Sequence, residues 1–381
     1  MAVCYEVKLM HKNTNYIILG GGCAGLSFAA HLLHEGLKDK HITIIEPRKT
    51  YSRDRTWCYW KVTEHLFSCC VSHRWPKMKM CTESESIIRE LGEYAFEYIK
   101  ADDYYKAAQA MLAQYDNVEL LLDTHSVSIH EQQDRIVIET NKGTINADYL
   151  FDSRPPDLDK ELIGRNDYML QCFVGWGVRT ENPIFDPTVF TLLDLDTSTK
   201  NPVFAYYILP TNECEAVICP IYFFRENIRY NDEVYEQRIK SYLAKNNSGN
   251  YQILHKEKAI LPMMLFDGDR RHPTARTYKL GAAAGLSRGV TAELFLNIQR
   301  YNAQLAKLIV NNDFVTTPNA FSKQAYFTDS LFLKRLHQHP EKYAEIEMKF
   351  LRNTPIDTAI RYLEDCMNDT DFSVLLNSFN K

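Results

Sequence analysis

The stretch NYIILGGGCAG, residues 15–25, decides the fold. A short apolar and β-branched run leads into three glycines, and from Ala24 to Leu37 the apolar residues recur at the spacing of an α-helix. The next apolar run, HITIIE at residues 41–46, is typical of a second strand and ends on an acid. A strand, a helix and a strand within about 30 residues predict the first unit of a dinucleotide-binding domain.

The glycine loop matches the GxGxxG pattern at Gly20, Gly22 and Gly25. In this pattern the first glycine makes a tight turn, the second lets the backbone reach a pyrophosphate, and the third lets the helix pack closely on the strand. The N–H groups at the start of the helix, around Cys23 and Ala24, then point at the phosphates. We assign these five residues to a cofactor site; the alternative is a glycine-rich turn of a doubly wound sheet without a ligand.

Glu46 lies 21 positions after Gly25, where an acid can accept hydrogen bonds from a ribose hydroxyl. An acid at this position favours FAD or NAD over a cofactor with a 2′-phosphate. The cofactor site is therefore predicted to include Glu46.

A second loop of small residues favours FAD over NAD. The sequence GAAAG at residues 281–285 follows a late apolar run, and such a loop lets a second backbone segment approach a long cofactor. We therefore assign Gly281 and Gly285 to the FAD site. We add Val127, at the start of a predicted strand, and Asp152, at the end of another.

The composition is that of an ordinary globular protein, with 381 residues, 45% hydrophobic and 24% charged. A net charge of −5 without long runs of either sign offers no basic surface, so we expect no nucleic-acid partner. The first residues lack a signal-peptide pattern and no apolar run of 18 residues occurs, so we expect a cytoplasmic protein. The ten cysteines form no C-x-x-C pair; we expect reduced thiols and no metal site.

The rest of the chain predicts a second domain threaded through the first. Strand-like runs dominate residues 171–223, and helical patterns dominate from about residue 321 onward. The expected fold is α/β, with a Rossmann-type FAD-binding domain interleaved with a β-sheet substrate domain and followed by a C-terminal helical segment. The predicted boundaries are 14–60, 101–165 and 255–311 for the FAD-binding domain, 61–100 and 166–254 for the β-rich substrate domain, and 312–381 for the helical segment.

The segment DRTWCYW, residues 54–60, follows the first unit and sets a charge pair beside three aromatic rings. Because of its position we expect it to border the flavin or the substrate cleft, with Arg55 counted in both the cofactor and the catalytic set and Asp54 in the catalytic set. The alternative is ordinary core packing of the rings and a structural salt bridge between Asp54 and Arg55.

Together these segments resemble the lycopene cyclase family, in particular its bacterial β-cyclase branch. The resemblance runs from Tyr16 to about Leu376, and DRTWCYW is its most specific part. Its carriers are YIILGGGCAGLS (16–27), DRTWCYW (54–60), DSRP (152–155), LQCFVGW (170–176), TLLD (191–194) and GLSRGVTAELFLNIQ (285–299).

The resemblance implies a reaction without net redox change on a linear polyene or isoprenoid. In the family, FAD reduced at the expense of NAD(P)H stabilises a carbocation, while an acid protonates a terminal alkene and a base removes a proton. An alkene is a very poor base, so such a site has to exclude water and surround the cation with negative or π-rich groups.

The chain departs from the family in two places. Cys219 stands where the family carries a glutamate on a strand of the substrate sheet, and the late loop reads RGVTAE at residues 288–293 where the family tends to read KPSTGY. We hypothesise that Glu293 replaces the missing acid, and we count Cys219 among the catalytic candidates. The alternative is that Glu293 caps the following helix, where a first-turn acid is favourable.

Two other functions stay open at this point. One is an FAD- and NAD(P)H-dependent monooxygenase or other oxidoreductase of specialised metabolism; the other is an inactive FAD-containing protein that binds an apolar ligand. For an apolar substrate we expect at most peripheral contact with the inner face of a membrane, through the aromatic stretch at residues 326–332.

Overall fold

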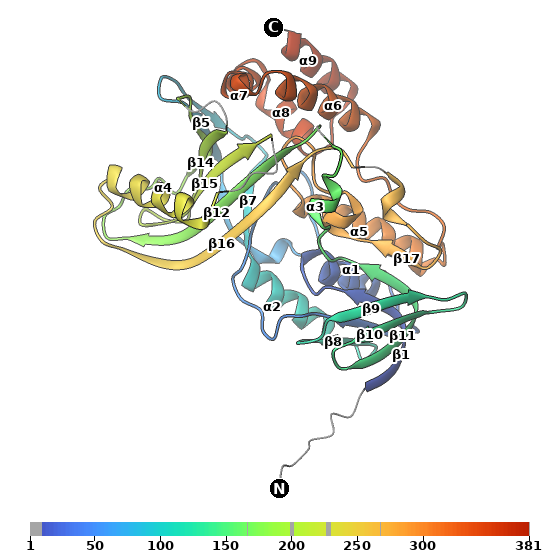
Figure 1. The fold of residues 1–381 in the computed structure, drawn as a ribbon. Helices are drawn as coiled ribbons and strands as arrows, with labels where there is room; N and C mark the ends of the chain where they lie inside the picture. Colours follow the sequence, from blue (N-terminus) through green and yellow to red (C-terminus); the bar gives the residue numbers. More distant parts are fainter. Residues whose placement is uncertain (1–9, 166, 199–201, 226–229, 267, 381) are drawn as a thin grey trace.

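The computed structural model describes residues 10–165, 167–198, 202–225, 230–266 and 268–380. Two large sheets lie side by side, and helices of the C-terminal segment pack over one end of the second sheet (Figure 1). This is the interleaved α/β architecture that the sequence predicts.

The first sheet contains the predicted dinucleotide-binding unit. Its strands run in the order β8 (Val118–Leu121), β2 (Ile42–Ile45), β1 (Met10–Leu19), β11 (Gly143–Asp152), β10 (Ile136–Thr140) and β9 (Ser126–Glu131), with β17 (Thr277–Lys279) beside β11. The strands β8, β2, β1, β11 and β17 pair in parallel, and β9 and β10 continue the sheet as an antiparallel meander. The carboxyl ends of β1, β2 and β11 therefore meet at one edge, where ligands bind in such sheets.

Side chains alternate along β1, so the sheet has two buried faces. Tyr16 and Ile18 pack against helices α1 (Cys23–His34), α2 (Ala101–Leu112) and α5 (Phe295–Val310). Ile17 and Leu19 pack against the apolar side chains of the β9–β10–β11 meander. Helix α1 is buried from Cys23 to Leu33, which explains why its sequence is apolar on all sides.

The second sheet forms the β-rich domain. Its strand order is β16 (Tyr251–Met263), β12 (Met169–Thr180), β15 (Glu215–Phe224), β14 (Val203–Pro210), β13 (Val189–Asp196), β5 (Lys77–Cys81) and β6 (Ser86–Glu90). Helix α4 (Asp232–Lys245) covers one face through Tyr235, Ile239 and Leu243. The opposite face looks toward the small sheet and the C-terminal helices.

The segment predicted to border the cleft forms strand β3 (Thr56–Trp60) of the small sheet, whose order is β3, β7 (Phe96–Lys100) and β4 (Val71–Trp75). Stacking of Phe96 on Phe190, with ring centroids 4.2 Å apart, joins the small sheet to the second sheet. The C-terminal helices are α6 (Lys323–Gln338), α7 (Tyr343–Asn353), α8 (Ile356–Leu363) and α9 (Asp369–Asn380). The remaining α-helix of the described chain is the short α3 (Leu158–Glu161).

Strand β16 departs from the predicted organisation. It pairs with β12 along its whole length, so residues 255–263 extend the second sheet, and the predicted boundary at residue 255 falls inside a strand. Its first half is exposed at the sheet edge and rich in charge, as edge strands often are, and this hides its β-pattern in the sequence. Within the part of the chain that the structure describes, no helix is long and apolar enough to cross a membrane.

Candidate active site

The glycine loop is held by the protein's own packing at two positions. Gly20 has a φ of +95°, which favours glycine. A Cβ on Gly25 would lie 2.0 Å from the Gly20 carbonyl oxygen, so helix and strand could not pack this closely with any side chain there. A Cβ on Gly22, by contrast, would meet only Arg48 Nη2, at 3.9 Å. Gly22 thus faces open space at the point where the pattern brings a pyrophosphate.

The start of α1 suits an anion. Gly22 is its N-cap, no side chain caps it, and its first turn contains no acid. The N–H groups at a helix start lack intrahelical acceptors, so here they are available to a ligand. Tyr104 donates to the Cys23 carbonyl at 2.8 Å and Asn302 to the Ala24 carbonyl at 2.9 Å, which fixes the helix start in place.

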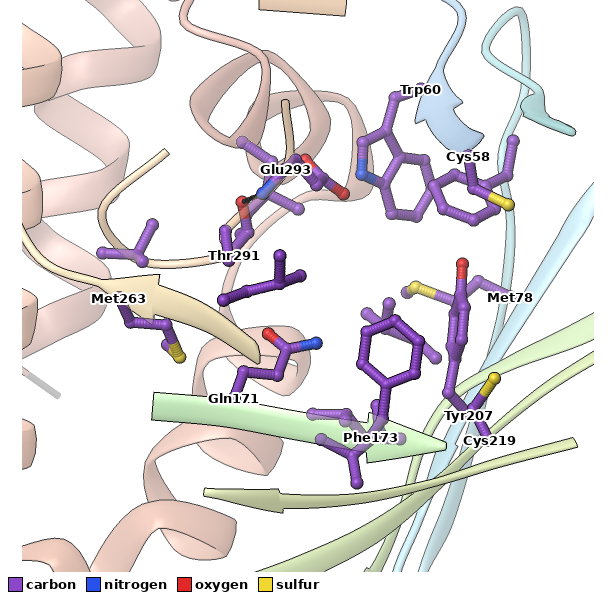
Figure 2. Close-up of a pocket in the computed structure, with 18 of the residues that line it drawn as sticks. Cys58, Trp60, Met78, Gln171, Phe173, Tyr207, Cys219, Met263, Thr291 and Glu293 are labelled. Atoms are coloured by element: carbon purple, nitrogen blue, oxygen red, sulfur yellow. Dashed lines mark hydrogen bonds between the residues drawn. The ribbon is translucent and has the colours of Figure 1, made fainter. Parts of the chain in front are cut away.

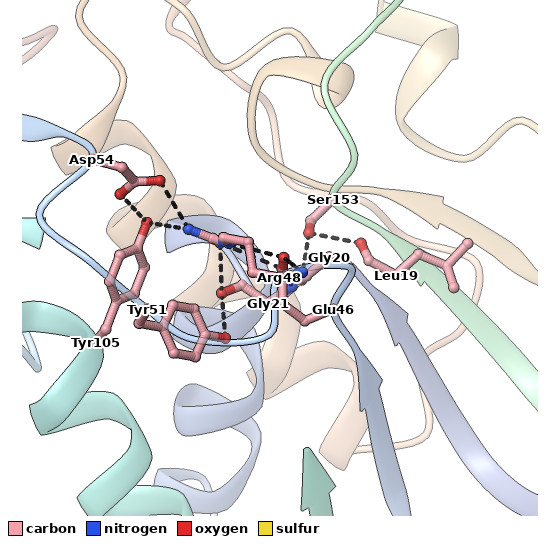
Figure 3. Close-up of polar contacts among 9 residues, drawn as sticks. All are labelled: Leu19, Gly20, Gly21, Glu46, Arg48, Tyr51, Asp54, Tyr105 and Ser153. Atoms are coloured by element: carbon pink, nitrogen blue, oxygen red, sulfur yellow. Dashed lines mark hydrogen bonds and ion pairs between the residues drawn. The ribbon is translucent and has the colours of Figure 1, made fainter. Parts of the chain in front are cut away.

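Glu46 lies against the glycine loop, as Figure 3 shows. Its Oε2 accepts the Gly21 N–H at 2.7 Å, and its Oε1 accepts the backbone N–H of Arg48 at 2.9 Å and its Nε at 2.8 Å. Burial alone would raise the pKa of Glu46, but these hydrogen bonds and the Arg48 charge hold it below its ordinary value. Glu46 is therefore an ionised acceptor at the predicted ribose position, and a ribose hydroxyl would share it with Arg48.

Asp54 belongs to the same network. It accepts from Arg48 Nη1 at 3.0 Å and from the Tyr105 hydroxyl at 3.2 Å (Figure 3), and it is not among the residues that line the cavity described below. Arg55 is exposed, donates to the Asp54 carbonyl at 2.6 Å, and lines the cavity. The structure thus separates the two residues, with Asp54 beside the glycine loop and Arg55 at the cavity.

The late loop, which we expect to approach the cofactor, lies beside the start of α1. Gly281 has a φ of +60°, and a Cβ there would lie 2.8 Å from the Ala24 Cβ; Gly285 ends the short 3₁₀ turn 281–284 with a φ of +76°. Asp152, at the end of β11, contacts Lys279 Nζ at 2.7 Å and accepts the Leu280 N–H through its carbonyl at 2.9 Å. Asp152 therefore ties the late loop to the first sheet.

Val127 lies at the start of β9, and its side chain is 69% exposed. Its neighbour Ser126 accepts a hydrogen bond from Arg154 Nη1 at 3.1 Å, and Arg154 in turn pairs with Asp152 at 2.8 Å. Val127 is thus connected to the ligand edge of the sheet through the backbone and not through its side chain.

A cavity of about 350 Å³ lies between the second sheet, β3, the loop at residues 290–295 and helices α7 and α8 (Figure 2). Ligand pockets of proteins start at about this size. The sheet contributes one face of alternating residues, so its wall is mainly apolar and aromatic. On β16 these residues are Glu257, Ala259, Leu261 and Met263; on the neighbouring strands they include Gln171, Phe173, Cys219, Ile221, Phe223 and Tyr207.

Glu293 enters the cavity from a tight loop. Arg288 and Glu293 close the loop by a backbone hydrogen bond of 2.9 Å, and Ala292 has a φ of +59°, a left-handed conformation that costs a residue with a Cβ about 1–2 kcal/mol. Figure 2 shows the carboxyl group directed toward the Trp60 indole. Glu293 caps no helix, because α5 begins only at Phe295 and has no side-chain cap, so the capping alternative is wrong.

The surroundings of Glu293 favour its neutral form. Burial, and after it the nearby carboxyl of Glu364, raise the pKa of Glu293 well above its ordinary value. Its Oε2 is buried and has no hydrogen-bond partner among the described residues. Glu364 accepts the backbone N–H of Trp60 at 2.9 Å, and burial raises the pKa of Glu364 to about 7. These surroundings therefore favour the protonated form of Glu293 in a mainly apolar wall.

Comparison with known proteins identifies the family. A sequence profile described as "Lycopene cyclase protein" matches residues 15–363. The chain belongs to the lycopene cyclase family. The comparison with curated proteins found no match.

Solved structures share the fold of this cyclase-family protein. It is similar to a geranylgeranyl bacteriochlorophyll reductase-like protein from Thermoplasma acidophilum, with a TM-score of 0.64 and 13% identity over 98% of this chain and 97% of that one. It is similar to a flavoprotein/dehydrogenase from Cytophaga hutchinsonii, with a TM-score of 0.65 and 10% identity over 97% and 96%. It is also similar to the flavin-dependent monooxygenase PieE, solved with FAD and substrate, with a TM-score of 0.61 and 11% identity over 97% of this chain and 71% of that one. These identities show the fold alone and confirm the predicted Rossmann-type flavoprotein architecture.

At Cys219 this cyclase-family protein has a buried thiol in the cavity wall. Burial raises its pKa well above the ordinary value, so it is neutral and a poor proton donor. Its Sγ lies 4.0 Å from Oε1 of Glu257, a carboxyl that the sequence interpretation missed. The available signal was the alternation of residues 257, 259, 261 and 263, in which one acid shares a face with three apolar side chains.

Proposed function

We propose that the protein is an FAD-dependent enzyme that protonates a linear polyene or isoprenoid inside the cavity and cyclises or isomerises it without net redox change. The observation that supports this most is Glu293: a buried carboxyl group whose surroundings favour its protonated form, directed into a mainly apolar cavity, with one oxygen that has no hydrogen-bond partner among the described residues. Protonation of an alkene needs a desolvated acid that still holds its proton at neutral pH next to a hydrophobic ligand, and burial favours this state of a carboxyl group.

The cofactor half of the proposal rests on the two loops. Gly20, Gly22 and Gly25 with the start of α1 would hold the pyrophosphate of FAD, and Glu46 would accept from its ribose. Bound FAD, reduced by NAD(P)H as an external reductant, would supply an electron-rich ring that stabilises positive charge in the substrate. The open space at Gly22 and the uncapped start of α1 are the features that fit a dinucleotide.

The protein's own residues would bind the substrate and keep the cation from water. Phe173 and Tyr207 on the sheet and Trp60 on β3 present aromatic surfaces to the cavity, and π-faces stabilise cations. Glu293 would give its proton to one alkene carbon as the cation forms. The volume of about 350 Å³ suits one end of a long polyene better than a whole one.

A substrate of this kind resides in membranes, so we also propose peripheral membrane contact. The exposed Phe327 and Leu331, one turn apart on α6, favour this. Vesicle flotation with and without Phe327→Ser, Leu331→Ser tests it.

The test of the reaction uses the flavin-loaded protein, NAD(P)H and linear polyenes such as lycopene, first in H₂O and then in D₂O. We expect a product of unchanged mass in H₂O that gains one deuterium in D₂O, with catalytic and not stoichiometric consumption of NAD(P)H. Glu293→Gln should lower kcat by about 10²–10⁴-fold with the flavin retained. Glu345→Gln, on the exposed face of α7, is the matched control.

Three results would count against the proposal or a part of it. Stoichiometric use of NAD(P)H and oxygen would identify a redox flavoenzyme such as a monooxygenase. Binding of polyenes without any turnover would identify a carrier. Unchanged turnover in Glu293→Gln would remove Glu293 from the mechanism.

A further inference from the structure

A row of four residues crosses the second sheet beneath the cavity. Glu257 on β16 pairs with Gly175 on β12, and Cys219 on β15 pairs with Tyr207 on β14. A Cβ on Gly175 would lie 2.6 Å from Cys219 Sγ and 3.1 Å from Glu257 Cγ. The glycine therefore lets the carboxyl of Glu257 and the thiol of Cys219 meet above the strand between them.

Glu257 is the carboxyl group that this face of the sheet presents to the cavity in the described chain. Its neighbours Lys256 and Lys258 point to the opposite face, where they pair with Glu236 at 2.7 Å and Asp232 at 2.9 Å. Glu257 itself is 7% exposed, and its hydrogen bond with Cys219 is long, at 4.0 Å. A carboxyl group is rarely buried without a close partner, because desolvation is costly.

Different groups act on Glu257 and on Glu293. Burial raises the pKa of Glu257 to about 7, and Thr56, Arg55 and Arg53 limit the rise. Burial, and after it the nearby carboxyl of Glu364, raise the pKa of Glu293 well above its ordinary value. Positive side chains thus favour ionisation of Glu257, whereas a second carboxyl opposes ionisation of Glu293, and two acids in such different surroundings are suited to opposite roles.

We propose that Glu257 is the base that completes the reaction begun by Glu293, an inference that rests on the proposed function. The O–H bond of Glu293 breaks as its proton forms a C–H bond with one alkene carbon, and Glu293 becomes a carboxylate. The cyclised or rearranged cation then loses a proton from a neighbouring carbon to the Glu257 carboxylate, and the C–H electron pair forms the new double bond. The sum is an isomerisation: one proton enters the substrate and one leaves.

The enzyme then has to return a proton from Glu257 to Glu293. The Cys58 thiol is placed to take part. Cys58 lines the same cavity as Glu257 and Glu293, and burial, followed by the charges of these carboxyl groups, raises the pKa of its thiol. Tyr207, in the row with Cys219, adds a hydroxyl to the same wall.

The decisive variant is Glu257→Gln, compared with Glu215→Gln, an acid of the same sheet that pairs with Arg179 outside the cavity. We expect Glu257→Gln to lower kcat by about 100-fold or more with KM for the polyene little changed. The cation that is not deprotonated should be captured by water, so an alcohol should accompany the cyclic alkene. A purely structural role would not change the product.

A relocation variant keeps the proposal testable if Glu257→Gln folds poorly. In the double variant Cys219→Glu, Glu257→Ala, the carboxyl group starts from β15, on the other side of Gly175, and reaches into the space that Glu257 leaves. We expect it to recover at least a tenth of the activity, which Glu257→Ala alone should lack. Failure of this rescue in a protein with normal flavin content would overturn the role of Glu257.

A turnover-independent probe is the tertiary amine N,N-dimethylgeranylamine, whose ammonium imitates the cation. Its affinity should fall by about tenfold or more in Glu257→Gln and stay unchanged in Glu215→Gln. If the wild-type protein turns over polyenes and Glu257→Gln has the same turnover, products and amine affinity, this inference alone is refuted. Absence of turnover in the wild-type protein would instead refute the proposed function.

Discussion

The buried ion pair behind the Glu293 loop gives the sharpest stability prediction. Arg288 is 0% exposed; its Nε lies 2.8 Å from Oδ2 of Asp329 on α6, and its Nη2 donates to Oδ1 at 2.9 Å. Burial raises the pKa of Asp329 to about 6 even with Arg288 beside it, so both groups are charged at pH 8. The pair anchors the loop that carries Glu293 to the C-terminal helices.

Asp329→Asn should leave the guanidinium buried and uncompensated. Removing one partner of a buried pair costs about 3–5 kcal/mol. Asn retains one acceptor, and Arg288 keeps its contacts with the rings of Phe321 and Tyr362, at 5.6 and 5.2 Å. We therefore expect Asp329→Asn to lower the free energy of unfolding by about 3 kcal/mol, the lower end of that range. This is a large fraction of the roughly 5–15 kcal/mol that stabilises a typical fold.

Urea unfolding at pH 8, followed by circular dichroism and by tryptophan fluorescence, measures this effect. The double variant Arg288→Met, Asp329→Leu should recover most of the loss, because apolar residues of similar size replace a buried pair at little cost. Glu85→Gln, which breaks the exposed pair with Arg352, should leave the unfolding midpoint unchanged. A loss below about 1 kcal/mol in Asp329→Asn, or a double variant as unstable as the single one, would refute the reasoning.

Two further predictions concern the cofactor loop and a second buried acid. Gly22→Val should lower the flavin content and leave the melting temperature of the flavin-free protein unchanged. Gly25→Ala should lower both quantities, because its Cβ would lie 2.0 Å from the Gly20 carbonyl oxygen. Equal behaviour of the two variants would contradict this prediction. Burial raises the pKa of Glu347, which hydrogen-bonds Tyr343, from 4.5 to about 7. The folded state holds this proton more tightly than the unfolded state, so the free energy of unfolding of the wild-type protein should fall as the pH rises from 4.5 through 7. In urea titrations between pH 5 and pH 9, Glu347→Gln should lose about 3 kcal/mol less of this free energy than the wild-type protein does. The same pH dependence in both proteins would exclude Glu347 as its source.

The cofactor half of the molecule could be predicted from the sequence because its signals are local. The helix expected from Ala24 to Leu37 spans Cys23–His34, and the strand expected at 41–46 spans Ile42–Ile45. Glycine spacing, apolar periodicity and the acid after the second strand each depend on neighbours within a few residues. The small residues of the late loop likewise indicate a close backbone approach, but not that Gly281 lies against Ala24.

The catalytic half depends on register, which the sequence does not display. Asp54 and Arg55 are adjacent in the chain, yet one joins the Glu46 network and the other lines the cavity, because successive side chains of an extended segment point apart. Glu257 lies in the edge strand β16, where charged residues obscure the alternation. Its place in the cavity wall becomes visible only once the pairing with Gly175 brings it close to Cys219.

The row of Glu257, Gly175 and Cys219 also shows how an acid can change strands while the cavity stays the same. Strands two places apart in a sheet are separated by about 10 Å, and a glutamate and a cysteine on the same face can span that gap if nothing stands between them. Gly175 meets this condition; even the Cβ of alanine would press on both side chains. A carboxyl group can therefore reach one point of the cavity from position 219 or from position 257. A Cβ at position 175 would lie 2.6 Å from Cys219 Sγ and 3.1 Å from Glu257 Cγ, so we expect Gly175→Ala to displace the Glu257 carboxyl and to lower turnover as much as Glu257→Gln does.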